Sequence, residues 1–320
     1  MPAVKVIEYI NRRNGTLVSF EILPPLKGKS IQSIYDTLDP LMEFKPPFIN
    51  VTYHRAEYMY KRNSQGLFEK VVIRKRPGTV GICAAIVNRY KADAVPHIVC
   101  GGFTKEETED AMIDLAFLGI NNLLIVRGDP EKSEATFQPE PGGHQHAIDL
   151  VKQAVSMNKG VFLQEDLTDV MPTDFCIGVA GYPEKHYEAP NMQSDLQHLK
   201  EKVDAGGEYI ITQMFFDNRK FFEFVRLCRE AGITVPIIPG LKPITSRKQM
   251  NTLPRLFHVD IPHEFAAELE RAKSDVEAKQ IGIAWCIQQC KELVKSGVPL
   301  LHFYTMSHPG PVKEVVSHVF

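Results

Sequence analysis

The feature that most constrains the fold of this sequence is a regular alternation of short apolar runs with longer helical patterns. Eight runs have the length and apolar content of buried strands: Leu17–Ile22, Phe48–Thr52, Val95–Val99, Asn122–Arg127, Phe175–Ala180, Tyr209–Gln213, Val235–Pro239 and Leu300–Tyr304. Helical periodicity predicts the intervening helices: Ser30–Phe44, Thr104–Leu118, His144–Met157, Asn191–Ala205, Asn218–Ala231, Ser246–Leu256 and Ala272–Ser296. Such alternation predicts a parallel sheet whose strands are joined by right-handed crossovers.

Eight is the number of strands that closes a (β/α)8 barrel within one domain. The rival architecture is a doubly wound open sheet, whose dinucleotide signature Gly-x-Gly-x-x-Gly follows the first strand. Here the first strand is followed by Pro24-Pro25-Leu26-Lys27-Gly28, which cannot serve as that signature. We therefore predict an α/β fold, a (β/α)8 TIM barrel of eight parallel strands, as one domain over residues 1–320.

Two additions to the barrel are expected. Residues Met1–Gly15 have the pattern of one short amphipathic helix. The segment from Tyr53 to Ala94 is longer than a normal crossover and is predicted to hold a helix followed by an extra strand or extended insert. It contains the basic stretch Arg74-Lys75-Arg76, interpreted as a solvated face rather than a binding patch, and the apolar run Thr79–Val87.

Composition excludes several classes of partner. The net charge is −2, so there is no bulk electrostatic attraction to nucleic acid or to an anionic membrane. The N-terminus lacks the apolar core of a signal peptide, and no apolar run is long enough to span a membrane. None of the six cysteines forms a CxxC pair, and Cys286 with Cys290 lacks further nearby metal ligands, which favours core packing. We expect a cytoplasmic protein without a metal.

Polar residues gather where the predicted strands end, which is where a barrel presents its active site. Glu21 lies in an apolar run, and a buried carboxylate is costly unless it has a task; the alternative is an edge-strand glutamate paired with a lysine. Asp129 follows the fourth strand, and hydroxyl, amide and aromatic residues follow others. Two carboxylates in such company suit a flat heteroaromatic ligand and one proton transfer, with the harder chemistry left to a cofactor.

An ordered set of motifs identifies a family resemblance. The motifs include Ser19-Phe20-Glu21 with Pro24-Pro25, Val51-Thr52-Tyr53, Pro96-His97, Arg127-Gly128-Asp129, Tyr182-Pro183-Glu184, Ile211-Thr212-Gln213, Ile238-Pro239-Gly240 and Phe303-Tyr304-Thr305. Each is weak alone, but in this order they cover nearly the whole chain. The sequence resembles methylenetetrahydrofolate reductase in its short bacterial form, which is the catalytic barrel without a C-terminal regulatory domain.

The resemblance implies a reaction and its participants. It implies an FAD-containing barrel that reduces 5,10-methylenetetrahydrofolate to 5-methyltetrahydrofolate with NADH or NADPH. The mechanism would be ping-pong, the product would supply methyl groups for methionine synthesis, and the assembly would be a homo-oligomer. Glu21 would be the general acid that opens the folate ring, which a raised pKa would allow near neutral pH. Asp129, if ionised, would stabilise the cationic folate.

The resemblance also implies ligand-binding residues. The residues implied for FAD are Thr52, His97, Arg127, Gly128, Asp129, His146, Ala180, Tyr182, His186, Asp195, His198 and Lys202. The residues implied for the substrates are Glu21, Gln213, Gln249 and Leu253. Three of these depart from the pattern of related bacterial enzymes, because His146, His198 and Leu253 stand where those enzymes commonly have Tyr, Asn and Phe.

Two other functions stay open at this point. One is a different FAD barrel, such as a proline-dehydrogenase-like enzyme. The other is a non-catalytic carrier of folate or flavin. A carrier needs no acid, so the presence of both Glu21 and Asp129 argues against it.

Overall fold

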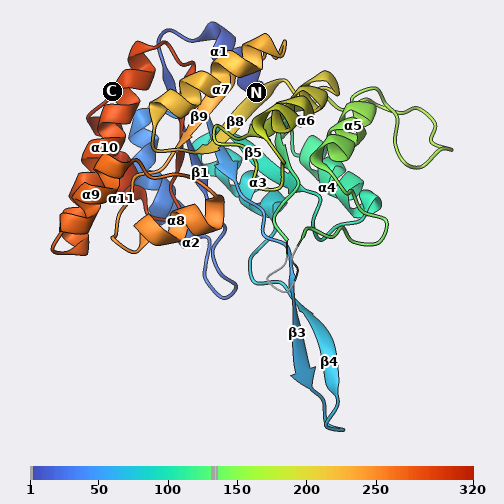
Figure 1. The fold of residues 1–320 in the computed structure, drawn as a ribbon. Coiled ribbons are helices and arrows are strands. Elements are labelled where there is room, and N and C mark those ends of the chain that lie inside the picture. Colours follow the sequence, from blue (N-terminus) through green and yellow to red (C-terminus); the bar gives the residue numbers. More distant parts are fainter. Residues whose placement is uncertain (1–2, 131–133, 135) are drawn as a thin grey trace.

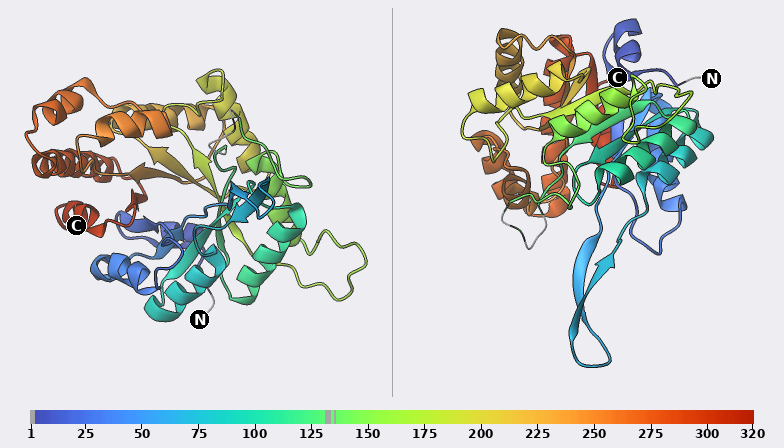
Figure 2. Two further views of the ribbon diagram at one scale, coloured as in Figure 1. Left: turned by 90° about the horizontal axis from the view of Figure 1, so that it is seen from below. Right: turned by 90° about the vertical axis from the view of Figure 1, so that its right-hand side faces the viewer.

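A computed structural model describes residues 3–130, 134 and 136–320. In this described part of the chain, eight parallel strands close into a barrel in the order β1-β10-β9-β8-β7-β6-β5-β2, and β2 returns to β1 (Figures 1 and 2). The barrel strands are β1 Leu17–Ile22, β2 Phe48–Val51, β5 Asp93–Val99, β6 Asn122–Val126, β7 Cys176–Gly181, β8 Tyr209–Met214, β9 Ile237–Leu241 and β10 Leu300–Tyr304. This confirms the predicted (β/α)8 barrel.

Helices surround the barrel, as Figure 2 shows in the view along it. They are α2 Gln32–Leu38, the 3-10 helix η1 Asp39–Phe44, α3 Thr79–Tyr90, α4 Lys105–Phe117, α5 Ala147–Met157, α6 Met192–Asp204, α7 Asn218–Glu230, α8 Gln249–Phe257, α9 His263–Arg271, α10 Asp275–Lys295 and α11 Pro309–Ser317. The single helix predicted over Ser30–Phe44 is divided into α2 and η1, because Pro40 lacks the N–H that would continue α2. Helices α9 and α11 were not predicted, since both are short and adjoin prolines.

The N-terminal helix α1, Val6–Arg12, covers the end of the barrel where the strands begin (Figure 1). Its Val6 and Ile10 are buried with residues from the starts of the strands, among them Phe48 and Leu300. The side chain of Asn122 accepts a hydrogen bond from Val6 N at 2.9 Å and donates one to Val4 O at 2.9 Å. This end of the barrel is therefore filled by apolar packing, and the polar residues collect at the opposite end.

The insert after β2 differs from the prediction. Strands β3, Glu57–Arg62, and β4, Phe68–Ile73, form an antiparallel hairpin that projects away from the barrel (Figure 1). Helix α3 follows this hairpin, so the predicted order of helix and strand was wrong. A local turn explains the hairpin: the Asn63 side chain accepts hydrogen bonds from the N–H groups of Gln65 and Leu67, and Gly66 has a positive φ of 83°.

The basic stretch at the base of the hairpin is attached to the loop that follows β1. The guanidinium of Arg76 donates a hydrogen bond to Pro24 O, and Lys27 N donates one to Lys75 O at 2.7 Å. Arg74 and Lys75 are exposed, as the prediction of a solvated face requires, whereas Arg76 is half-buried. The stretch therefore fastens the base of the hairpin beside the residues that follow Glu21.

Two further observations concern the described residues alone. No helix among them is long and apolar enough to cross a membrane, and no group of their His, Cys, Asp and Glu side chains could hold a metal ion. The six cysteines are all free and buried.

Candidate active site

The carboxylate of Glu21 lies between two histidines at the C-terminal end of the barrel. Its Oε2 is 3.3 Å from Nε2 of His97 on β5 and 3.6 Å from Nε2 of His302 on β10. Glu21 is 8% exposed and His302 is fully buried. An edge-strand glutamate paired with a surface lysine is therefore excluded, and the group is placed where a barrel carries its chemistry.

The electrostatics of Glu21 oppose one expectation from the sequence. Burial raises the pKa of Glu21, but the charge of His97 and the contacts with both histidines lower it by more. The net result is a pKa of about 2. The shift is therefore opposite in direction to the raised pKa expected for a general acid. Burial also lowers the pKa of His302 below its ordinary value, against the opposing effect of Glu21. The three groups form one buried, coupled acid–base cluster.

Sequence reasoning missed the supporting residues of this cluster. The Oγ of Ser19 lies 2.8 Å from His302 Nδ1, and Nδ2 of Asn50 lies 3.3 Å from His97 Nε2. Both residues are fully buried. Strand periodicity offered a signal, because Ser19 and Glu21 point to one face of β1 and His302 pairs in register with Ser19. His97 was expected among the FAD ligands, and the structure brings it to Glu21.

A second cluster lies where the β7–α6 loop meets α6. Lys202 Nζ donates a hydrogen bond to Ala180 O at 2.8 Å, and Asp195 accepts one from His186 N at 2.9 Å. The rings of Tyr182 and His186 are 4.7 Å apart and meet edge to face. Burial lowers the pKa of Lys202 to about 8, against the charge of Asp195. Five of the residues expected to hold FAD are thus brought together here.

The remaining residues expected to hold FAD are spread around the mouth of the barrel. Arg127 pairs with Glu188 at 2.6 Å, and its guanidinium carbon lies 5.0 Å from the ring centre of Phe137. Thr52 follows β2, and its hydroxyl is buried without a hydrogen-bond partner among the residues that the structure describes. Gly128 has a positive φ of 88°, which favours glycine at the turn after β6.

Three of the expected site residues are exposed: Asp129, His146 and His198. Burial, followed by the charges of Asp195 and Asp129, raises the pKa of Tyr182, so the charge of Asp129 reaches the second cluster. His146 is the residue before α5, and its backbone N–H donates a hydrogen bond to the carboxylate of Asp149 at 3.2 Å. His198 lies on α6 one turn from Asp195. These positions leave all three side chains available to a ligand.

Apart from Glu21, the residues expected to bind substrate lie at the end of β8 and in α8. Gln213 accepts a hydrogen bond from Met214 N at 2.9 Å through its side-chain oxygen. Gln249 and Leu253 line a pocket of about 350 Å³ between α8 and α11. Leu253 is 4% exposed, so it presents little surface beyond that pocket.

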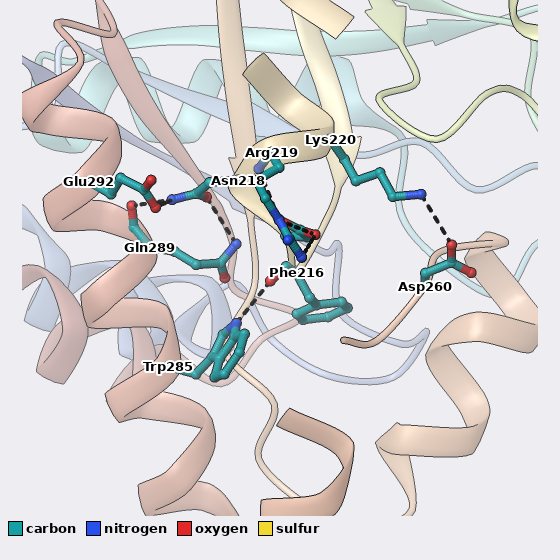
Figure 3. Close-up of polar contacts among 9 residues, drawn as sticks. Phe216, Asn218, Arg219, Lys220, Asp260, Trp285, Gln289 and Glu292 are labelled. Atoms are coloured by element: carbon teal, nitrogen blue, oxygen red, sulfur yellow. Dashed lines mark hydrogen bonds and ion pairs between the residues drawn. The ribbon is translucent and has the colours of Figure 1, made fainter. Parts of the chain in front are cut away.

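The turn after β8 is held firmly against α10 and the loop that follows α8 (Figure 3). The amide of Asn218 donates to Gln289 O at 3.1 Å, and Trp285 donates through its indole N–H to Phe216 O at 2.9 Å. Lys220 lies 3.5 Å from Asp260. These contacts fix the segment that carries Gln213 toward the mouth of the barrel.

Glu184 joins the same loop to the second cluster. Its Oε2 accepts a hydrogen bond from Asp260 N at 2.6 Å, while its Oε1 is buried and has no partner within the described part of the chain. Burial, with the charges of Asp260 and Asp217, raises the pKa of Glu184 to about 7 despite the hydrogen bond. A carboxyl that is easily protonated therefore connects the β7–α6 loop to the loop after α8.

Comparison with known proteins decides the family. A family model described as methylenetetrahydrofolate reductase matches residues 6–319. The chain belongs to the methylenetetrahydrofolate reductase family. Similar relatives include methylenetetrahydrofolate reductase 2 of Saccharomyces cerevisiae, 33% identical over 95% of this chain and 48% of its own length. The 5,10-methylenetetrahydrofolate reductase of Salmonella typhimurium is 33% identical over 91% of this chain and 86% of its own.

The chain spans about half the length of the yeast and Arabidopsis thaliana methylenetetrahydrofolate reductases that it matches. Among solved structures, a Clostridium thermocellum protein that binds two copies of 5-methyl-5,6,7,8-tetrahydrofolic acid aligns with a TM-score of 0.56. It covers 98% of both chains at 13% identity, so this likeness concerns the fold alone. In a member of the methylenetetrahydrofolate reductase family, two features need a functional explanation. They are the cluster around Glu21 and the second cluster, at the β7–α6 loop.

Proposed function

We propose that this chain reduces 5,10-methylenetetrahydrofolate to 5-methyltetrahydrofolate with NADH or NADPH, using FAD in a ping-pong mechanism. The observation that carries the proposal is Glu21, a carboxylate buried with two histidines at the C-terminal end of the barrel of a family member. A carrier of folate or flavin would have no use for a buried acid–base cluster, and family membership disfavours a proline-dehydrogenase-like enzyme.

The second cluster fits FAD. Lys202 is a half-buried cation without an ion-pair partner among the described residues, and the buried hydroxyl of Thr52 lacks a hydrogen-bond partner. A phosphate would satisfy such a cation, and a polar ring edge would satisfy such a hydroxyl. Together with Arg127, Tyr182 and Asp195, these residues would hold the cofactor. When bound, FAD supplies the hydride carrier between nicotinamide and folate.

The protein supplies the proton. The ring nitrogen of the folate leaves poorly unless it is protonated, and opening of that ring gives an iminium cation. The two histidines hold the pKa of Glu21 low, so its carboxyl has to take up a proton before it can act as the acid. A ligand that covers the cluster removes water from it, which favours the neutral carboxyl and raises its pKa, so that the carboxyl can hold the proton that it donates. The imidazole nitrogen nearest to that carboxyl is Nε2 of His97, at 3.3 Å.

The choice of nucleotide and the assembly are proposed from the relatives alone. Relatives are named for both NADH and NADPH, as in Arabidopsis thaliana and Caenorhabditis elegans. We therefore propose NADH or NADPH as the reductant without choosing between them. We also propose a homo-oligomer that supplies methyl groups for methionine synthesis, on the strength of the family. The six free buried cysteines suit the reducing cytoplasm in which such an enzyme would work.

One spectroscopic experiment tests the function. The purified protein should have the absorbance of an oxidised flavin. Anaerobic NADH or NADPH should bleach this absorbance, and methylenetetrahydrofolate added afterwards should restore it. A protein that is colourless after loading with FAD, or one that is bleached and then not restored by the folate, would contradict the proposal.

A further inference from the structure

A pocket beside the Glu21 cluster has an unusual balance of charge. It has a volume of about 350 Å³ and lies between α8, α11 and the ends of β9 and β10. Lys242, Gln249 and His308 line it together with apolar residues such as Leu253 and Phe257. The lining residues, all within the described part of the chain, include no aspartate and no glutamate. The pocket therefore has positive charge without a protein counter-charge.

Lys242 is the source of that charge, and it is 7% exposed. Its ammonium reaches only Pro243 O, at 3.5 Å, and no carboxylate of the described residues pairs with it. Burial lowers the pKa of Lys242 to about 8. An ammonium with three donors and one long contact is poorly satisfied, and a buried polar group in this condition is expected to bind something.

The pocket is connected to the acid–base cluster through its own wall. Thr305 lines the pocket, and its hydroxyl donates a hydrogen bond to the backbone oxygen of Glu21 at 2.7 Å. Tyr304 also lines the pocket, and it pairs in register with Glu21. The pocket and the acid–base cluster therefore share the end of β10 as a common wall.

We propose that Lys242 binds an anionic group of one of the two substrates, while the apolar wall formed by Leu253 and Phe257 contacts the neighbouring flat part of that substrate. This inference rests on the proposed function for the identity of the substrates. Both substrates carry suitable anions: the folate ends in the carboxylates of its glutamate, and the dinucleotide carries phosphates. The shared chemistry is an anion that follows a flat ring, and binding to truncated ligands distinguishes the two sources.

The experiment measures equilibrium binding to the purified FAD-loaded protein, so it does not depend on turnover. Lys242→Met removes the charge and keeps most of the side-chain volume. Lys248→Met is the matched control, because Lys248 is exposed at the start of α8 and does not line the pocket. The ligands are 5-methyltetrahydrofolate and the carboxamide of 5-methyltetrahydropteroate, in which a neutral amide replaces the glutamate and its carboxylates. NADH and reduced nicotinamide riboside, which lacks phosphate, form the second pair.

If the carboxylate is the anion, Lys242→Met should weaken 5-methyltetrahydrofolate binding by roughly 10-fold to 100-fold, as expected for one charge-assisted hydrogen bond. It should leave binding of the neutral carboxamide unchanged. If the phosphate is the anion, the same contrast should appear between NADH and the riboside. Lys248→Met should change neither pair. Unchanged binding of both complete ligands, or equal weakening of complete and truncated ligands, would overturn the inference.

Two additional measurements separate failure of this inference from failure of the proposed function. Flavin bleaching and restoration in the wild-type protein tests the function without reference to Lys242. Thermal unfolding tests a purely structural role, since replacing an unpaired buried ammonium with an apolar group should leave the melting temperature unchanged or raise it. A lower melting temperature for Lys242→Met together with equal losses for all four ligands would assign the lysine to packing.

Discussion

Thr305 donates two hydrogen bonds to the backbone oxygen of Glu21, from its hydroxyl at 2.7 Å and from its N–H at 3.2 Å. The two residues are separated by most of the chain and meet where β10 closes the barrel against β1. Thr305 is 2% exposed, so these bonds are shielded from water. The backbone that carries the Glu21 carboxylate is therefore held from the other end of the sequence.

Replacing Glu21 separates the two half-reactions. Glu21→Gln is nearly isosteric and removes the proton-donating carboxyl, so the variant should bind FAD and be bleached by NADH at close to the wild-type rate. It should then fail to be restored by methylenetetrahydrofolate, because the leaving nitrogen needs a proton. Stopped-flow absorbance measures both steps. Equal rates of folate-dependent restoration in the wild type and the variant would remove Glu21 from the mechanism.

Replacing Asp129 tests the role of an exposed charge. Asp129→Asn should retain FAD, because the residues of the second cluster, which are proposed to hold the cofactor, are all still present. It should slow the folate-dependent step by roughly 100-fold or more if one preorganised charge stabilises the cationic intermediate. Single-turnover rates with folate give the comparison. Wild-type rates in the variant would show that this carboxylate lies too far out in solvent to act.

Replacing Lys202 tests the FAD site. Lys202→Ala should lose FAD on dilution and lower the melting temperature of the holoprotein, since bound cofactor stabilises the fold by mass action. Lys200→Ala is the control, because Lys200 lies on the same helix and pairs with Asp204. Fluorescence of released flavin against protein concentration reports the affinity. Equal retention of FAD in the two variants would assign Lys202 to the structure of the β7–α6 loop.

Glu184 predicts a dependence of stability on pH. Its pKa is raised from 4.5 to about 7 in the folded protein, so its protonated form favours folding. That contribution is complete below about pH 4.5 and is lost as the pH rises through about 7. Glu184→Gln should therefore become more stable relative to the wild type as the pH rises. Urea unfolding at about pH 5 and about pH 8 gives the two differences, and a constant difference would contradict the prediction.

The sequence was a good guide to the barrel, because strand β1 and its neighbours are defined by local apolar runs. It was a poor guide to the order of elements in the insert. The helical period of Thr79–Val87 indicated a helix, but the turn at Asn63, which forms the hairpin before that helix, was not recognised. It predicted Glu21 as a functional acid and missed His302 as its neighbour. Their contact depends on the register between β1 and β10, at opposite ends of the chain. The charge of His97, together with the contacts with both histidines, reverses the expected direction of the Glu21 pKa shift.

The projecting hairpin has a consequence for how this protein opens. In the described structure β3 and β4 pair only with each other, and several of their apolar side chains face water, with Tyr60 67% and Phe68 73% exposed. A lone two-stranded ribbon is marginally stable in water. The barrel strands pair on both sides and are closed into a ring. The amide hydrogens of the hairpin should therefore exchange with solvent far sooner than those of β1 or β10, and its tip should be cut first by a protease while the barrel stays folded.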